Sequence, residues 1–303
     1  MKKFFVLLIA ALLWTVPAQV YAVDEDALTA RIEEFYSTLP QVKGDYKSRQ
    51  RPILLEGAMN IETDVFVRAL KNPVVYRELN YLFVAGTYKG YPVVVARTEQ
   101  GLANAASSTA LAIRKFNPVA VINQGTAGSH DPNLHVGDIV VGAETVGTSA
   151  IKTAYSPAGA GIDLTQQEMR GTFAFDETSG KFQRYTKYHV DPTLFNMAFA
   201  VANAHENFSV VSGTIGTSDT WLNCVDYINF LHEKYGTSCE EMETNAVAQI
   251  CYTAGIPFVG IRVISNSALT GEDFSVESAT VAQNFVLLVV EDYVNKILRA
   301  SKS

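Results

Sequence analysis

Apolar and polar positions along the chain follow two periods in turn, one typical of strands and one typical of helices. Short, continuous apolar runs occur at 53–55, 119–122 and 258–264, as expected for strands that are buried on both faces of a sheet. Apolar residues at helical spacing mark further segments, at 24–38, 62–70, 103–116, 192–204, 225–233, 244–254 and 279–298. The alternation predicts an α/β fold class with a mixed, largely parallel central sheet flanked by helices.

Two regions depart from this simple alternation. The β-rich runs 81–85 and 91–97 flank Lys89-Gly90, which indicates a hairpin. Residues 148–188 are rich in Gly, Ser, Thr and Tyr, and we expect them to form a long loop or a hairpin excursion between strand-like runs at 136–146 and 209–216. A segment of this kind inside a compact domain is usually a lid, a binding loop or an interface element.

The first 22 residues have the features of a secretory signal peptide. Lys2 and Lys3 precede an apolar stretch at 4–16, and 20–22 (VYA) supplies small residues at the two cleavage positions. A membrane anchor is the alternative, but the apolar stretch is short for a bilayer. We therefore expect a signal peptide at 1–22, an N-terminal helical extension at 23–51 and one α/β domain at 52–303. The mature protein would be periplasmic or secreted, with no membrane contact after cleavage.

Composition narrows the classes of function. The chain has 24 basic and 31 acidic residues and no basic cluster, so a nucleic acid is not an expected partner. Cys224, Cys239 and Cys251 have neither CxxC nor zinc-site spacing, and the five His residues form no HxH or HExxH pattern. We expect no metal site and no cofactor. The cysteines would be buried thiols, or two of them would be bridged in an oxidising compartment.

Polar residues cluster where the expected strands end, which is where ligands bind in sheets of this class. The segments are 57–62 (GAMNIE), 123–128 (NQGTAG), 217–221 (TSDTW) and 265–267 (SNS), with 240–243 (EEME) before a helix. Together they resemble the methylthioadenosine/S-adenosylhomocysteine nucleosidases of the purine nucleoside phosphorylase superfamily. The resemblance runs from about residue 53 to the C-terminus and is strongest over 240–266. It implies a nucleoside phosphorylase-like fold and hydrolysis of a purine nucleoside.

The resemblance also implies roles for residues around the ribose. Cleavage passes through an oxocarbenium-like ribose, so the enzyme must hold the sugar and aim a water at its anomeric carbon. By the GAMxxE match, Glu62 would orient and deprotonate that water. By the EME match, Glu243 would accept hydrogen bonds from both ribose hydroxyls, Met242 would pack on the sugar and Glu241 would lie nearby. Thr126 would lie near the ribose or the nucleophile.

Other positions would bind the base. Trp221 falls where the family places an aromatic residue that stacks on the base, and Leu222 would offer its backbone to the base edge. Asp219, in the same segment, is a further expected substrate contact. Asn266 stands where the family has an Asp that protonates ring nitrogen 7. An amide has no proton to give, but it can donate to an oxygen at purine position 6, so we expect a preference for 6-oxopurine nucleosides.

Two alternative functions remain open on the sequence. A phosphorylase would need an anion site, and Arg97 is the residue that could supply one, although 57–62 contains no Arg. A nucleoside-binding protein without turnover is the second alternative, because of Asn266. Members of the resembled family are oligomers, so a homo-oligomer in which 148–188 supplies contacts is also expected.

Overall fold

The computed structural model of the protein describes residues 25–176 and 178–298, and the expected signal peptide lies outside these ranges. Within them, no helix is both long enough and apolar enough to cross a membrane. Cys224, Cys239 and Cys251 are all free thiols, the first exposed and the other two buried. Of the two alternatives left open by the sequence, the structure has the free thiols, although Cys224 is not buried as expected.

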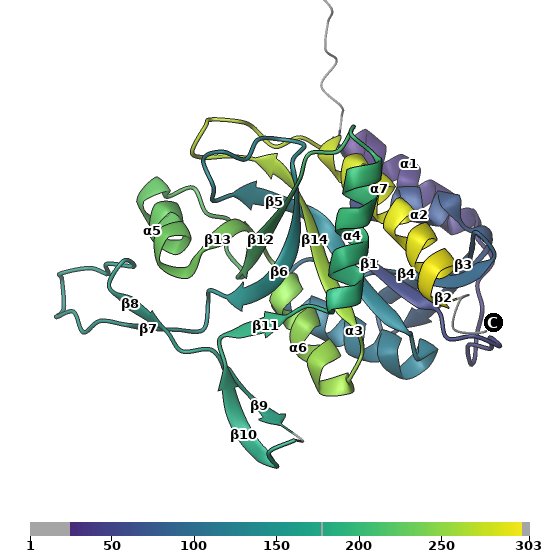
Figure 1. The fold of residues 1–303 in the computed structure, drawn as a ribbon, viewed down its shortest axis with the longest axis horizontal. Helices are drawn as coiled ribbons and strands as arrows, with labels where there is room; N and C mark the ends of the chain where they lie inside the picture. The colour runs from purple at the N-terminus through teal and green to yellow at the C-terminus, as the bar shows by residue number, and fades with distance from the viewer. Residues whose placement is uncertain (1–24, 177, 299–303) are drawn as a thin grey trace, which may run out of the picture.

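A ten-stranded mixed sheet forms the centre of the fold, as expected (Figure 1). Its middle strands run parallel, in the order β4, β1, β5 and β14. From β14 the sheet continues through β6, β12 and β13 and returns to β5, so these five strands close into a ring. The bounds of these strands are β1 (Ile53–Gly57), β4 (Tyr91–Arg97), β5 (Ala120–Ser129), β6 (Ile139–Gly147), β12 (Val210–Thr217), β13 (Thr237–Glu241) and β14 (Phe258–Asn266).

Antiparallel strands extend both ends of the sheet. β2 (Lys71–Glu78) and β3 (Tyr81–Tyr88) continue outward from β4, and the expected hairpin turn at Lys89-Gly90 joins β3 to β4. At the other end β11 (Lys187–His189) pairs with β6.

Helices cover both faces of the sheet. α1, α2, α4 and α7 lie on one side, and α3 and α6 lie on the other, while α5 packs beside β13 (Figure 1). Their bounds are α1 (Glu25–Thr38), α2 (Asp64–Ala69), α3 (Leu102–Phe116), α4 (Pro192–Ala204), α5 (Val225–Tyr235), α6 (Thr244–Ala254) and α7 (Ser278–Tyr293), with a 3-10 turn η1 (Asn60–Glu62) and a π-helical end η2 (Val294–Leu298). Each face therefore has its own apolar core.

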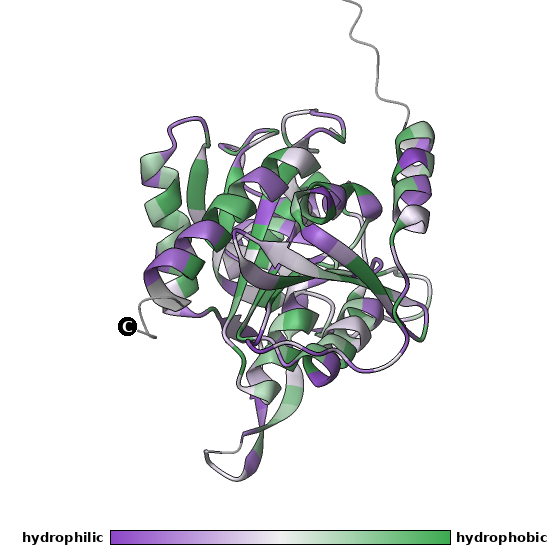
Figure 2. Ribbon diagram, turned by 90° about the vertical axis from the view of Figure 1, so that its right-hand side faces the viewer, coloured by the Kyte–Doolittle hydropathy of each residue, from purple (hydrophilic) through white to green (hydrophobic). Residues whose placement is uncertain are grey.

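The N-terminal extension joins the main core. α1 stands at one side of the molecule and carries hydrophobic and hydrophilic residues in alternation (Figure 2). Its Ile32 and Tyr36 are buried in the same cluster as the apolar face of α7. The Tyr36 hydroxyl lies 3.0 Å from Oγ1 of Thr63, the residue that follows Glu62. The extension is thus structurally continuous with the α/β domain and reaches the region of the expected active site.

The expected excursion at 148–188 forms two hairpins that project from the domain (Figure 1). One is β7 (Ile151–Thr153) with β8 (Gln167–Met169), and the other is β9 (Thr172–Asp176) with β10 (Lys181–Tyr185). The second hairpin carries exposed aromatic side chains, Phe173, Phe175 and Phe182.

One prediction about the chain path was wrong. Residues 125–128 were expected to form a loop after a short strand, but they lie inside β5, which continues to Ser129. The partner β14 pairs with β5 along this stretch, so residues 125–128 are held in the sheet next to the end of β14.

Candidate active site

A cavity with a volume of about 250 Å³ opens at the carboxyl ends of β1, β5, β13 and β14. Its wall includes seven of the nine residues expected from the sequence to act on substrate, among them Glu62 and Asn266. The lining residues are Ala58, Met59, Glu62, Gln100, Thr126, Ala127, Gly128, Thr220, Trp221, Glu240, Glu241, Met242, Glu243, Ser265, Asn266 and Phe274.

Glu62 is held by four hydrogen-bond donors although it is almost fully buried. Its Oε2 accepts from the backbone N–H groups of Ala58 and Met59, at 2.9 and 3.0 Å. Its Oε1 accepts from the backbone N–H and the hydroxyl of Thr126, at 2.8 and 2.9 Å. These donors orient the carboxylate, and the Thr126 hydroxyl is the one that can rotate away and leave a lone pair for a water.

Gly125 lets this arrangement form. A Cβ added to it would lie 2.8 Å from Oε1 of Glu62 and 2.7 Å from Nη1 of Arg262. The first glycine of the NxGxAG motif therefore has a physical reason, because any larger residue at this position would push the Glu62 carboxylate or the Arg262 guanidinium aside.

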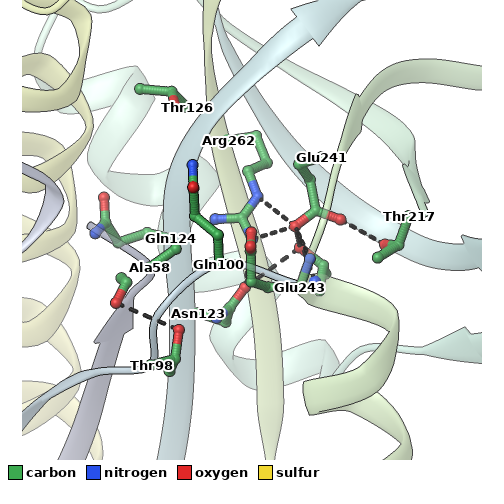
Figure 3. Close-up of polar contacts among 12 residues, drawn as sticks. Ala58, Thr98, Gln100, Asn123, Gln124, Thr126, Thr217, Glu241, Glu243 and Arg262 are labelled. Atoms are coloured by element: carbon green, nitrogen blue, oxygen red, sulfur yellow. Dashed lines mark hydrogen bonds and ion pairs between the residues drawn. The ribbon is translucent and has the colours of Figure 1, made fainter. Parts of the chain in front are cut away.

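Glu241 makes contacts inside the protein rather than toward a ligand. Its Oε2 accepts from the backbone N–H groups of Glu243 and Thr244, from the Thr244 hydroxyl and from Arg262, and its Oε1 accepts from Thr217 (Figure 3). With all these donors in place, Glu241 has little capacity left to bind substrate. It positions the end of β13 and the start of α6.

Arg262 is fully buried beneath the cavity and was not singled out from the sequence. It pairs with Glu241, donates to Oδ1 of Asn123 at 2.6 Å and lies 3.8 Å from Oε2 of Glu243 (Figure 3). Because it sits within an apolar strand of nine residues, its charge is the only sequence signal that could have revealed it. A buried guanidinium requires paired carboxylates nearby.

Glu243 lines the cavity and keeps acceptor positions free. Its Oε1 accepts from the Gly101 N–H at 2.9 Å, and its remaining close neighbour is Arg262. Burial is the main cause that raises the pKa of Glu243, the charge of Glu241 adds to it, and Arg262 opposes both. Met242 lines the same wall.

Aromatic and amide groups also line the cavity. Trp221 is 59% exposed, and its ring lies 6.0 Å from that of Phe274, which packs against the core; both residues line the cavity. Asn266 ends β14, where its Oδ1 accepts from the hydroxyl of Ser265 at 2.9 Å. The Asn266 side-chain amide nitrogen has no partner among the hydrogen bonds of the described residues.

The structure corrects two expected substrate contacts. Asp219 does not line the cavity; its Oδ1 accepts from the N–H of Leu102 at 2.8 Å and so caps the N-terminus of α3. Leu222 is buried, and its N–H donates to Oε1 of Glu240 at 2.8 Å instead of facing a base. Both residues hold the segment that carries Trp221.

Arg97 is paired with acids from two directions. Its guanidinium contacts Glu33 of α1 and lies 2.9 Å from Oε1 of Glu99. Its charge is thus balanced by two carboxylates, one of them supplied by the N-terminal extension. An arginine whose charge is already balanced by two carboxylates is a weak ligand for a phosphate ion.

Comparisons with known proteins bear on the family and the fold of this chain. Residues 52–295 match the phosphorylase superfamily. The 5′-methylthioadenosine/S-adenosylhomocysteine nucleosidase of Geobacillus sp. (strain WCH70) is 30% identical, and the match covers 78% of this chain and 97% of the relative. The corresponding nucleosidase of Neisseria meningitidis, solved in complex with methylthio-immucillin-A, is 25% identical with a TM-score of 0.65, covering 80% of this chain and 99% of that one. Futalosine hydrolase of Helicobacter pylori has the same fold, with a TM-score of 0.64 at 22% identity and coverage of 80% and 98%.

Proposed function

The chain belongs to the phosphorylase superfamily and, within it, to the methylthioadenosine/S-adenosylhomocysteine nucleosidase family, and from this premise we propose how its cavity works. The protein is a purine nucleosidase, which hydrolyses the bond between base and ribose and releases the free base. The observation that best supports the roles below is that Glu62, Glu243 and Asn266 come from three distant parts of the chain and line one cavity.

Glu62 is the general base in this proposal. As the bond from C1′ to the base breaks, its electron pair leaves with the base and the ribose becomes positively charged. A water attacks C1′, and Glu62 takes one proton from it, using the acceptor position that the Thr126 hydroxyl now fills. The negative carboxylate also stabilises the cationic ribose at the transition state.

Glu243 binds the ribose hydroxyls. It is buried, with one backbone donor on Oε1 and no hydrogen bond to Oε2 within the described part of the chain. A vicinal diol supplies the two donors that such a carboxylate lacks. Met242 lines the wall beside it and would pack on the sugar.

Asn266 favours a 6-oxopurine base. Its amide nitrogen can donate to an oxygen at position 6 while its oxygen holds a proton on nitrogen 7. That proton must come from water or another group, because the amide cannot supply it. A 6-aminopurine would force the amide to flip and would lose this contact, which costs about 2–4 kcal/mol at a transition state.

Release of free base from chosen nucleosides tests these roles. Inosine, adenosine and methylthioadenosine are incubated with the protein, with and without phosphate. We expect base release that needs no phosphate, with inosine faster than the other two. Dependence on phosphate would make the protein a phosphorylase, and no release would leave a binding protein. A tenfold or greater preference for methylthioadenosine would refute the argument from Asn266.

Substitution of the general base gives the second test. Glu62→Gln should retain nucleoside binding and lose hydrolysis on the order of a hundredfold or more. The matched control is Glu206→Gln, at an exposed residue before β12, which should leave turnover unchanged. Unchanged turnover in Glu62→Gln would remove Glu62 from the mechanism.

We propose that the mature protein is exported to the periplasm or secreted. The expected cleavage site after Ala22 falls shortly before α1, whose Ile32 and Tyr36 are packed in the core. Cleavage there would leave all the described residues intact. N-terminal sequencing of protein from the periplasmic fraction should begin at Val23, and an uncleaved chain retained in the cytoplasm would contradict the proposal.

We also propose that the protein is a homo-oligomer, with the β9–β10 hairpin touching a second copy. Phe173, Phe175 and Phe182 are 58%, 46% and 72% exposed on this one projection, and such apolar clusters mark interaction surfaces. Light scattering should give at least a dimer, and Phe182→Ser should weaken it. A strictly monomeric, fully active protein would contradict the proposal.

A further inference from the structure

Glu240 lines the cavity, but neither the sequence motifs nor the proposed mechanism assigns it a role. It precedes Glu241 in β13, so the two side chains leave the strand on opposite faces. Glu241 enters the Arg262 cluster, while Glu240 lines the cavity together with Trp221 and Met242.

The hydrogen bonds of Glu240 are incomplete for a buried carboxylate. Its Oε1 accepts from the Leu222 N–H at 2.8 Å, and within the described part of the chain its buried Oε2 has no hydrogen bond and lies 3.9 Å from Nε2 of His130, which has none either. By contrast, Glu62 accepts from four donors. A carboxylate has about four acceptor positions and Glu240 lines the cavity, so it can accept a further hydrogen bond from a ligand. A buried polar group left in this state needs an explanation.

Glu240 lies at the base end of the cavity. Gly128 separates it from Asn266: a Cβ added to Gly128 would lie 3.3 Å from Nδ2 of Asn266 and 3.6 Å from Cγ of Glu240. The two side chains therefore flank one glycine on one wall. The segment whose Leu222 donates to Glu240 also carries Trp221.

The edge of a purine presents nitrogen 7, the substituent at position 6 and nitrogen 1 in that order. Resting on the proposed function, in which Asn266 contacts the first two, we propose that Glu240 contacts the third and so selects the base. Nitrogen 1 of a 6-oxopurine carries a hydrogen, which an ionised Glu240 accepts. Nitrogen 1 of a 6-aminopurine carries a lone pair, which an ionised Glu240 repels and a protonated Glu240 can bind.

Protonation of Glu240 makes this selection depend on pH. Burial raises its pKa to about 7, the Leu222 N–H opposes that shift, and Glu241 adds to it. Of the other titratable groups around it, His130 has Nε2 3.9 Å away, and burial holds the pKa of that imidazole at about 3, so it stays neutral. Tyr227 and Cys239 have pKa values raised by burial and also stay neutral near pH 7.

The test compares inosine with adenosine, which share the same ribose and differ in the base. The ratio of their kcat/KM values cancels effects on the sugar and the water, including titration of Glu243. Between pH 5.5 and 8.0 we expect the ratio of inosine to adenosine to rise on the order of tenfold, with a midpoint near 7. 1-Methylinosine, which carries a methyl group in place of the hydrogen on nitrogen 1, should be cleaved more slowly than inosine, and the difference should shrink as the pH falls.

Two variants separate selection of the base from support of the Leu222 backbone. Glu240→Gln retains an oxygen for the Leu222 N–H and places an amide NH₂ where Oε2 was, so its ratio should favour adenosine and should not change with pH. Glu56→Gln is the matched control, because burial also raises the pKa of Glu56, to about 8, but Glu56 does not line the cavity. Its ratio should keep the pH dependence of the natural protein.

The outcomes are distinguishable. If bases are released but the ratio does not change with pH in the natural protein, or still rises in Glu240→Gln, the role of Glu240 is refuted and the nucleosidase function stands. If neither nucleoside releases its base, the proposed function fails and this inference fails with it. The pH series and 1-methylinosine use the unaltered protein, so they decide the question even if Glu240→Gln does not fold.

Discussion

Replacing Arg262 with Met should destabilise the protein severely, and the size of the loss follows from what the residue leaves behind. Arg262 is 1% exposed and provides the positive charge that faces Glu241, which is just as deeply buried. Met fills a similar volume but leaves the Glu241 carboxylate without a counter-charge. Removing one partner of a buried ion pair costs about 3–5 kcal/mol, against a total stability of roughly 5–15 kcal/mol.

Urea denaturation at pH 7 measures this loss directly. The matched control is Arg68→Met, because Arg68 pairs with Asp64 on an exposed surface where such pairs contribute about 1 kcal/mol or less. The double variant Arg262→Met with Glu241→Gln removes the uncompensated charge and should recover part of the loss. If Arg262→Met costs less than about 1 kcal/mol, or if the two single losses simply add, the buried charge does not matter as argued.

Three further substitutions test other parts of the site. Burial raises the pKa of Glu56 from 4.5 to about 8, so the stability that its protonated form contributes is full below pH 4.5 and is lost as the pH rises through 8. Glu56→Gln should therefore reduce the loss of unfolding free energy between pH 5 and 9 in urea denaturation. An unchanged dependence of that free energy on pH would contradict this. Gly125→Ala should lower kcat/KM by on the order of a hundredfold, because the new Cβ would meet Glu62 and Arg262; normal base release would show that both can move. Trp221→Ala should raise KM about tenfold with little change in unfolding free energy, and an unchanged KM would remove the stacking role.

Local signals were strong where helices begin and end. The bounds expected for α4 and α6 agree with the structure. For α4 the reason is visible, because the Asp191 side chain accepts from the Leu194 N–H at 2.9 Å and Pro192 fills the first turn. For α6 it is Gly255, which ends the helix in the left-handed conformation.

Strands that depend on distant partners could not be predicted in the same way. β2 contains Pro73, and its register shifts between Lys71 and Val74, so the sequence does not look like a strand. β13 contains Glu240 and Glu241 in five residues, a polar composition that is atypical of a buried strand. It is stable in the sheet because Arg262 and Leu222 supply donors to those two carboxylates.

The active site shows the same division. Glu62 and Glu243 could be singled out because the resemblance is carried by short, local motifs, GAMNIE and EEME, and both residues line the cavity. The contacts of Asp219 with Leu102 and of Leu222 with Glu240 join residues that are distant or on separate elements, so no local pattern reveals them. Those are the places where the expected substrate contacts were wrong.

The distribution of charge in the cavity bears on the choice between water and phosphate. Among the described residues that line it, four are glutamates and none is Lys or Arg. The charge of Arg262, beneath the wall, is balanced by Glu241, and that of Arg97 by Glu33 and Glu99. No cationic side chain among the described lining residues is available to bind a phosphate ion, whereas the Glu62 carboxylate stabilises the cationic ribose of the transition state. The same acidic wall therefore favours a neutral nucleophile and lowers the barrier to breaking the glycosidic bond, which is why hydrolysis suits this cavity better than phosphorolysis.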